Sequence, residues 1–126
     1  MKQVWVVDDD EEMGRAVGLL LKVLEYEVAT FYNVRSAVKT LLIGRHPDLI
    51  VLNLDMPEVS GLDMVEFLRR KPELRKIPIV MLAAEVADSI VDQALALGAD
   101  SYIVKPVTLE ELKQAIDQAF EKHLTP

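Results

Sequence analysis

The chain has 126 residues, of which 14 are Lys or Arg and 21 are Asp or Glu, so its formal net charge is −7. Because 51% of the residues are apolar, a chain of this length can bury the core of one self-sufficient domain. We expect residues 1–126 to form that single domain, with a core over 1–122 and a tail or the start of a linker at 123–126.

Composition also excludes several classes of protein. The absence of Cys rules out disulfides, thiolate metal sites and thiol nucleophiles. The apolar runs are only about as long as a strand, which excludes a membrane span. The acidic balance opposes direct binding to nucleic acid. The acidic N-terminal sequence is unlike a signal peptide, so we expect a cytoplasmic protein.

The first half of the chain alternates short apolar blocks with helical patterns. Residues 4–7 form a continuous apolar block, and apolar residues at helical spacing follow from Met13 to Leu24. Residues 27–32 alternate and contain β-branched side chains, which predicts a strand. The amphipathic stretch 36–42 predicts a helix that stops at Gly44. We therefore predict two strand–helix units.

The second half repeats this pattern three times. The apolar block 49–52 is followed by a predicted helix over 62–68 that ends before Pro72. The block 77–82 precedes a predicted helix from about 86 to 97, and the block 102–104 precedes a helix over 109–120. Thr108 and Glu111 form a predicted capping box at the start of that last helix.

Five strand–helix units joined by short loops predict an α/β fold with a parallel sheet, right-handed crossovers and helices on both faces. The blocks 4–7, 49–52 and 77–82 are continuously apolar, as strands buried on both faces are, so we expect them at the centre of the sheet. This is the five-stranded, doubly wound, flavodoxin-like order 2-1-3-4-5. Ligands of such sheets bind beyond the carboxyl ends of the strands, where strands one and three meet.

Polar residues follow the strands at that edge. Asp8 and Asp9 follow the first strand, Asn53 and Asp55 the third, and Lys105 the fifth. Two adjacent carboxylates with a third oxygen ligand suit a hard cation such as Mg²⁺, and a Lys opposite them suits a phosphoryl group. The acids 10–12 are expected at the N-terminus of the following helix, although a shift of the acidic pair to residues 9–10 stays open.

Four segments carry a resemblance to a known family: VVDD at 6–9, LDMP at 54–57 with Gly61 behind it, PIVML at 78–82 and GADSYIVKP at 98–106. The chain resembles the response-regulator receiver domain, the phosphoacceptor module of two-component signalling, over essentially its whole length. The resemblance implies that two carboxylates after the first strand and one at the end of the third bind Mg²⁺. It further implies that the third carboxylate accepts a phosphoryl group from a histidine kinase.

The resemblance also assigns roles to individual residues. In the family a Thr or Ser after the fourth strand turns toward the phosphate, and a Lys before a cis-type Pro pairs with that phosphate. Carried over to this sequence, the roles are acidic pocket for Asp8 and Asp9, phosphate-side cation for Lys105, switch aromatic for Tyr102 and cis-type turn for Pro106.

Two positions depart from the family pattern. Asn53 stands at the acceptor position, and an amide is not a phosphoryl acceptor. Ala83 stands at the hydroxyl position and cannot hydrogen-bond a phosphate. Asp55 lies where the family gives a backbone carbonyl to the metal, with its side chain pointing away. Because the pocket has one carboxylate fewer, we expect weakened Mg²⁺ binding, with Asn53 offering a neutral oxygen.

Other residues have simpler interpretations. We expect Trp5 in the core and Tyr102 in a packing role rather than a switch, and we assign no role to His46 or His123. The predicted helix over 86–97 carries few charges. In receivers this helix, the fifth strand and the last helix form the usual partner face. Its low charge favours protein association. The resemblance implies a histidine kinase or other signalling proteins as partners, and a second copy of the chain is a further possibility.

Several functions stay open from these observations. The first is an atypical receiver that is not an enzyme, is not phosphorylated at the standard site and acts through protein contacts. The second is an ordinary Mg²⁺-dependent phosphoacceptor receiver whose acceptor Asp was engineered to Asn53. The third is a phosphohydrolase of the aspartate-nucleophile type, which Asn53 disfavours. A flavin- or nucleotide-binding module is disfavoured because no Gly-rich loop follows the first strand.

Overall fold

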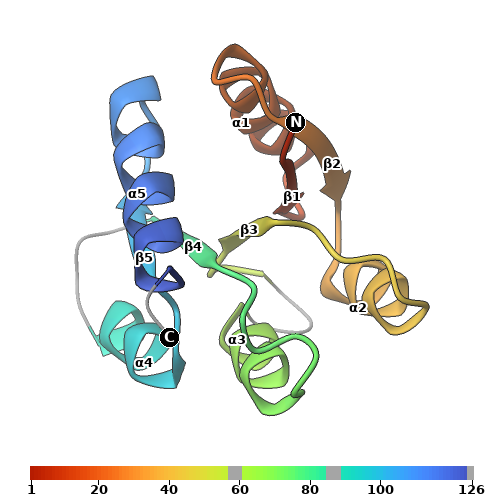
Figure 1. The fold of residues 1–126 in the computed structure, drawn as a ribbon. Helices are drawn as coiled ribbons and strands as arrows, with labels where there is room; N and C mark the ends of the chain where they lie inside the picture. Colours follow the sequence, from red (N-terminus) through yellow and green to blue (C-terminus); the bar gives the residue numbers. More distant parts are fainter. Residues whose placement is uncertain (57–60, 85–88, 125–126) are drawn as a thin grey trace.

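The computed structural model describes residues 1–56, 61–84 and 89–124. Strands and helices alternate along the chain (Figure 1). The strands are β1 (Gln3–Val7), β2 (Glu27–Phe31), β3 (Leu49–Asn53), β4 (Ile79–Ala83) and β5 (Ser101–Val104). The helices are α1 (Glu11–Val23), α2 (Val34–Leu42), α3 (Gly61–Arg70), α4 (Ser89–Leu97) and α5 (Leu109–Lys122).

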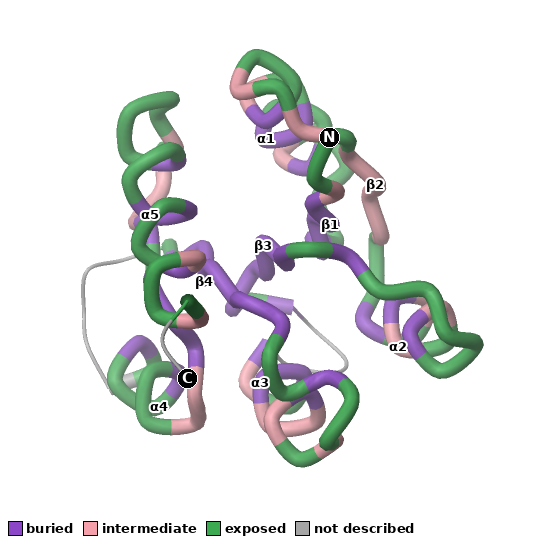
Figure 2. The backbone as a smooth tube through the Cα atoms, viewed as in Figure 1, coloured by how far each residue is buried: buried purple, intermediate pink, exposed green. Residues whose placement is uncertain are grey.

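The strands form one parallel sheet in the order β2-β1-β3-β4-β5, so the predicted fold is confirmed. The central strands β3 and β4 are buried along their whole length, whereas β2 and β5 lie at the edges. Figure 2 shows this contrast between the buried centre and the exposed outer sides of the helices. Hydrophobicity on both faces of a strand therefore predicted correctly that β1, β3 and β4 are central and that β2 and β5 lie at the edges.

The core has two layers because successive strand residues point to opposite faces of the sheet. On one face, Trp5 and Val7 of β1 pack in a cluster that includes buried residues of α2, α3 and α4. On the other face, Val4 and Val6 pack in a cluster that includes buried residues of α1 and α5. Trp5 is buried as expected, with its ring centroid 4.6 Å from that of Phe31.

One strand begins later than predicted. The sequence suggested a strand over 77–82, but β4 begins at Ile79. The Ile77 N–H donates to the Leu74 carbonyl in a turn, and Pro78 has no N–H to donate. The beginning of the helix predicted from about residue 86 falls partly outside the described residues, and α4 is described from Ser89.

Side chains cap the helices where the sequence predicted. The Asp10 carboxylate accepts the N–H groups of Glu12 and Met13 at the start of α1. Thr108 Oγ1 accepts the Glu111 N–H at 3.2 Å, and the Glu111 carboxylate accepts the Thr108 hydroxyl at 2.9 Å. Asp10 is thus occupied by helix capping, which separates it from Asp8 and Asp9. No helix within the described residues is long and apolar enough to cross a membrane.

A buried ionic cluster joins β5, α3 and α5 at the end of the sheet opposite to the carboxyl ends of the strands. The Asp100 carboxylate accepts from the Ile79 N–H at 2.8 Å and from Arg69 at 3.0 Å. His123, which we assigned to a tail without a role, lies 2.9 Å from the same carboxylate. Burial lowers the pKa of Arg69, and the charge of Asp100 opposes that shift. His123, one residue beyond α5, therefore contacts Asp100, the residue that precedes β5.

Two glycines are expected to respond oppositely to substitution by Ala. At Gly61 a Cβ would lie 2.7 Å from the Asn53 carbonyl oxygen, so Gly61→Ala should cost about 1–3 kcal/mol of unfolding free energy. At Gly18 in α1 the nearest atom is 3.5 Å away, so Gly18→Ala should add about 0.5–1 kcal/mol through helix propensity. Urea unfolding of both variants measures this. Equal stability of the Gly61→Ala variant and the parent would contradict the close approach of α3 to β3.

Candidate functional site

The acidic pair lies directly beyond β1, at the carboxyl edge of the sheet. The Asp8 N–H donates to the Phe31 carbonyl at 3.0 Å, which continues the β1–β2 pairing and fixes the backbone of Asp8. Asp8 is only 1% exposed, and its Oδ1 accepts the Asp10 N–H at 3.0 Å. Asp9 is exposed on the same loop. The described geometry therefore pairs Asp8 with Asp9 and leaves Asp10 to the helix.

Asn53 ends β3 and joins the groups around it. Its amide nitrogen Nδ2 lies 3.1 Å from Asp8 Oδ1 and 3.4 Å from Asp9 Oδ1. The same nitrogen lies 3.1 Å from the Asp55 carbonyl oxygen. The amide oxygen Oδ1 accepts the Asp55 N–H at 3.3 Å. One amide thus contacts both carboxylates and both backbone groups of Asp55.

Lys105 approaches the opposite side of this amide. Lys105 follows β5, and its N–H donates to the Ala83 carbonyl at 2.9 Å. Its Nζ donates to Asn53 Oδ1 at 3.1 Å. The peptide bond between Lys105 and Pro106 is cis, as the resemblance implied. The structure therefore brings together Asp8, Asp9, Asn53, Asp55 and Lys105, which lie far apart in the sequence.

Electrostatics in this cluster are dominated by the burial of Asp8. Burial raises the pKa of Asp8 above its ordinary value. The hydrogen bond from the Asp10 N–H and the positive charge of Lys105 oppose this rise, whereas the negative charges of Asp9 and Asp10 add to it. Asp8 Oδ2 is the buried side-chain oxygen or nitrogen that has no hydrogen-bond partner among the described residues. An unpartnered carboxylate oxygen in a buried position is costly unless a cation or a donor compensates it.

The donor set fits a hard cation in part. Asp8, Asp9 and the Asp55 carbonyl offer oxygen atoms, which are the ligands that Mg²⁺ prefers. Within the described parts of the chain, no three His, Cys, Asp or Glu side chains gather in a metal-binding arrangement. Asn53 turns its nitrogen rather than its oxygen toward the two carboxylates and this carbonyl.

The other two residues singled out in the sequence lie at the neighbouring strands. Ala83 ends β4 and is buried, so a methyl group stands there. Tyr102 on β5 is 44% exposed, so it is not enclosed in the core. Tyr102 lines a groove of about 620 Å³ between β5 and α5, together with Gln114 and Gln118.

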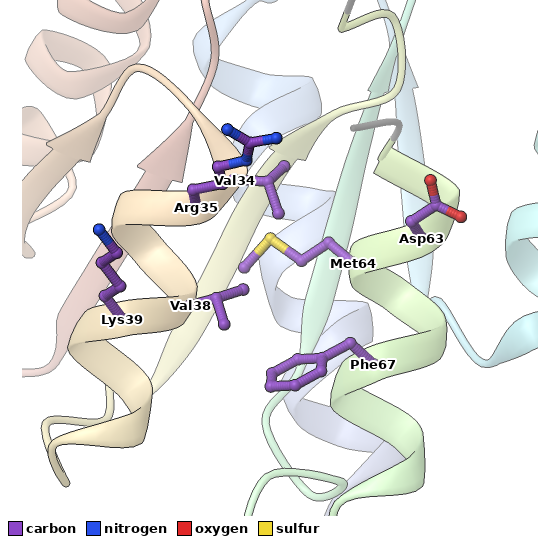
Figure 3. A pocket seen from close by; sticks show the side chains of 7 residues that line it. All are labelled: Val34, Arg35, Val38, Lys39, Asp63, Met64 and Phe67. Atoms are coloured by element: carbon purple, nitrogen blue, oxygen red, sulfur yellow. The ribbon is translucent and has the colours of Figure 1, made fainter. Parts of the chain in front are cut away.

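A second cavity lies between α2 and α3 (Figure 3). Its volume is about 350 Å³. Val38 of α2 and Met64 and Phe67 of α3 point into it, with Arg35 and Lys39 on the α2 side. None of the polar residues that the sequence singled out lines this cavity.

The sequence identified the residues at the site but not how they are connected. Strand ends and the resemblance gave Asp8, Asp9, Asn53, Asp55 and Lys105. Neither signal indicated that the Asn53 amide donates to both carboxylates while it accepts from Lys105, because the orientation of an amide depends on its neighbours in space. The one signal in the sequence was that an Asn side chain, unlike that of Asp, has one donor atom and one acceptor atom and must therefore orient them toward different neighbours.

Comparisons with known proteins identify the family of this chain. The family model of the response regulator receiver domain matches residues 4–117. The phosphate regulon transcriptional regulatory protein PhoB of Rhizobium meliloti is 36% identical over 112 residues, which are 89% of this chain and 49% of that protein. The hybrid signal transduction histidine kinase D of Dictyostelium discoideum is 38% identical over 109 residues, which are 86% of this chain and 7% of that kinase.

A solved structure extends the comparison to the fold. The chemotaxis protein CheY4 of Vibrio cholerae has a TM-score of 0.85 and 28% sequence identity, over 94% of this chain and 98% of that chain. The chain spans about half the length of several curated relatives. A match of the family model to most of the chain, together with this fold, shows that the protein belongs to the response regulator receiver domains of two-component signalling.

Proposed function

We propose that this receiver is atypical: it is not phosphorylated at the standard position and acts through contacts with other proteins rather than as an enzyme. The observation that carries the proposal is Asn53 at the end of β3, hydrogen-bonded to Asp8 and Lys105. In the family pattern this position holds the acceptor Asp, and an amide oxygen does not form an acyl phosphate. Residues 1–126 act as a single cytoplasmic module in this proposal.

Ala83 supports the same proposal independently. Its buried methyl group offers no hydroxyl to a phosphoryl group at the strand ends. Without such a hydroxyl, no side chain at position 83 can transmit a change in the pocket to Tyr102. We therefore propose that Tyr102 contributes to a partner surface and not to a phosphorylation switch.

The proposed partner face consists of α4, β5 and α5. Among the described residues of these elements, four large apolar side chains are exposed: Ile90 and Tyr102 at 44%, and Leu95 and Leu109 at 37%. Within the described part of α4, Asp92 is the charged residue. Exposed apolar side chains with few charges favour protein association. A histidine kinase or another signalling protein is the proposed partner, and a second copy of the chain is the alternative.

The second candidate function is an ordinary phosphoacceptor receiver in which Asn53 is an engineered replacement of the acceptor Asp. The retained pocket favours it, because Asp8, Asp9 and Lys105 still surround position 53. Ala83 counts against it, since one deliberate substitution does not account for both departures. The natural gene sequence distinguishes the two candidates.

Intact-mass measurement after incubation with acetyl phosphate and Mg²⁺ tests the proposal. We expect the chain to stay unmodified and the Asn53→Asp variant to gain one phosphoryl group. An Asn53→Ala variant, which also lacks a carboxylate at this position, is the matched control and is expected to stay unmodified. Phosphorylation of the chain as it stands would contradict the proposal and would point to Asp55 as the acceptor.

A further inference from the structure

The hydrogen bonds of Asn53 assign its two amide atoms to different neighbours. The Lys105 ammonium and the Asp55 N–H are donors, and both face Oδ1, at 3.1 Å and 3.3 Å. Asp8 Oδ1 and the Asp55 carbonyl oxygen are acceptors, and both face Nδ2 at 3.1 Å. If the amide were rotated by half a turn, its N–H groups would face the donors and its oxygen would face the acceptors. The observed orientation is therefore strongly preferred.

In this orientation the amide nitrogen lies beside the oxygens that a cation would require. Nδ2 contacts Asp8, Asp9 and the Asp55 carbonyl, the three oxygen-bearing groups at the strand ends. Asp8 Oδ2 stays without a partner among the described residues, although Asp8 is 1% exposed. Asp8 Oδ2 is therefore an oxygen that could bind a cation. Asn53, however, directs its amide N–H groups toward the same place, and these N–H groups repel a cation.

An Asp at position 53 would not face this conflict. A carboxylate has two equivalent oxygens, so one could accept from Lys105 while the other contacts a cation. The amide of Asn53 has a single oxygen, and this oxygen already accepts from Lys105 and from the Asp55 N–H, which occupies both of its lone pairs. Contact of the Asn53 oxygen with a cation thus requires the loss of one of these two hydrogen bonds, and the bond from Lys105 is charge-assisted and of the stronger kind.

We propose that Lys105 is a positioning residue that opposes Mg²⁺ binding by holding the Asn53 amide with its nitrogen toward Asp8, Asp9 and the Asp55 carbonyl. The amide N–H groups stand in for the cation, so the pocket keeps its hydrogen bonds without metal. This inference rests on the proposed function, because it concerns the pocket of a receiver that does not take a phosphoryl group. It adds that Lys105 acts on the metal site through hydrogen-bond geometry and not only through its charge.

A double-mutant cycle separates these two effects. Lys105→Met removes the ammonium group, and calorimetric titration with Mg²⁺ measures the affinity before and after, in the chain as it stands and in the Asn53→Asp variant. Loss of the positive charge raises the affinity in both backgrounds. Only with Asn53 does the substitution also remove the charge-assisted bond that helps to hold the amide nitrogen toward the carboxylates, so we expect the affinity there to rise about tenfold more.

Two controls keep the result specific. Lys113→Met removes a positive charge from exposed α5 and is expected to leave the Mg²⁺ affinity unchanged. Lys105→Arg keeps a charged donor and is expected to keep the low affinity. The side-chain ¹⁵N–¹H₂ resonances of Asn53 provide a second measurement, and we expect them to shift on addition of Mg²⁺ in the Lys105→Met protein but not in its parent.

Three outcomes would overturn the proposal. Equal gains in both backgrounds would mean that Lys105 acts through charge alone. A gain that is larger in the Asn53→Asp background would reverse the predicted coupling. Absence of Mg²⁺ binding in all four proteins would show that these oxygens do not form a cation site. Phosphorylation of the parent chain, measured by mass, would refute the proposed function without altering this cycle, so the two failures are distinguishable.

Discussion

Replacing Asn53 with Asp is expected to lower the free energy of unfolding by about 2–3 kcal/mol in the absence of divalent cations. The variant loses the N–H groups that Asp8 and the Asp55 carbonyl accept at 3.1 Å. It also places a third carboxylate beside two others, and like charges at this distance repel. Lys105 compensates only part of that repulsion, because a single ammonium faces three carboxylates.

Mg²⁺ is expected to reverse this loss in the variant and to have little effect on the parent. A cation would occupy the space between the carboxylates, and we expect the affinity of the variant to be higher by about tenfold or more, since sites of this kind tune affinity through the number of charged ligands. At a concentration of about 100 times its dissociation constant, the ion would add about 2.7 kcal/mol to the stability.

Urea unfolding with EDTA and with Mg²⁺ measures both effects in the two proteins. Asn53→Ala is the matched control, because it removes the amide without adding a charge, and its stabilisation by Mg²⁺ should stay well below that of the Asn53→Asp variant. Equal responses of the parent and the Asn53→Asp variant to Mg²⁺ would show that Asp8, Asp9 and position 53 do not share a cation site.

Loss of the Asp100 carboxylate is expected to be the most destabilising single substitution considered for this protein. Asp100 is 8% exposed, and its carboxylate accepts from Arg69, from the Ile79 N–H and from His123. Asp100→Ala would leave the guanidinium of Arg69 buried without its counter-charge. Breaking a buried pair in this way costs about 3–5 kcal/mol.

Thermal or urea unfolding tests this expectation, with a surface ion pair as the control. Asp117 pairs with Lys113 at 2.9 Å, but both side chains are more than half exposed. Asp117→Ala is therefore expected to leave the stability nearly unchanged. His123→Ala should fall between the two, because Asp100 keeps Arg69 and the Ile79 N–H. A similar stability of the Asp100→Ala and Asp117→Ala variants would refute the structural role of the buried cluster.

Much of the architecture follows from local properties of the chain. Apolar strands without alternation predicted that β1, β3 and β4 are central, because strands buried on both faces need no polar side. Asp10 and Thr108 predicted helix starts, since their oxygens accept backbone N–H groups within three residues. The start of β4 was two residues off because hydrophobicity does not reveal that Ile77 donates within a turn.

The candidate site was likewise predictable in part from the sequence. Order along the chain and parallel pairing place Asp8, Asn53 and Lys105 at one edge of the sheet, and the resemblance supplied their expected roles. Only the folded chain decided which amide atom of Asn53 faces Lys105, that Asp8 Oδ2 stays without a partner among the described residues, and that His123 packs on Asp100. Each of these depends on contacts between residues more than twenty positions apart.

The sequence by itself determined which chemical groups reach the carboxyl edge of the sheet. The tertiary structure decided how they pair, because hydrogen-bond direction depends on the positions of all neighbours at once.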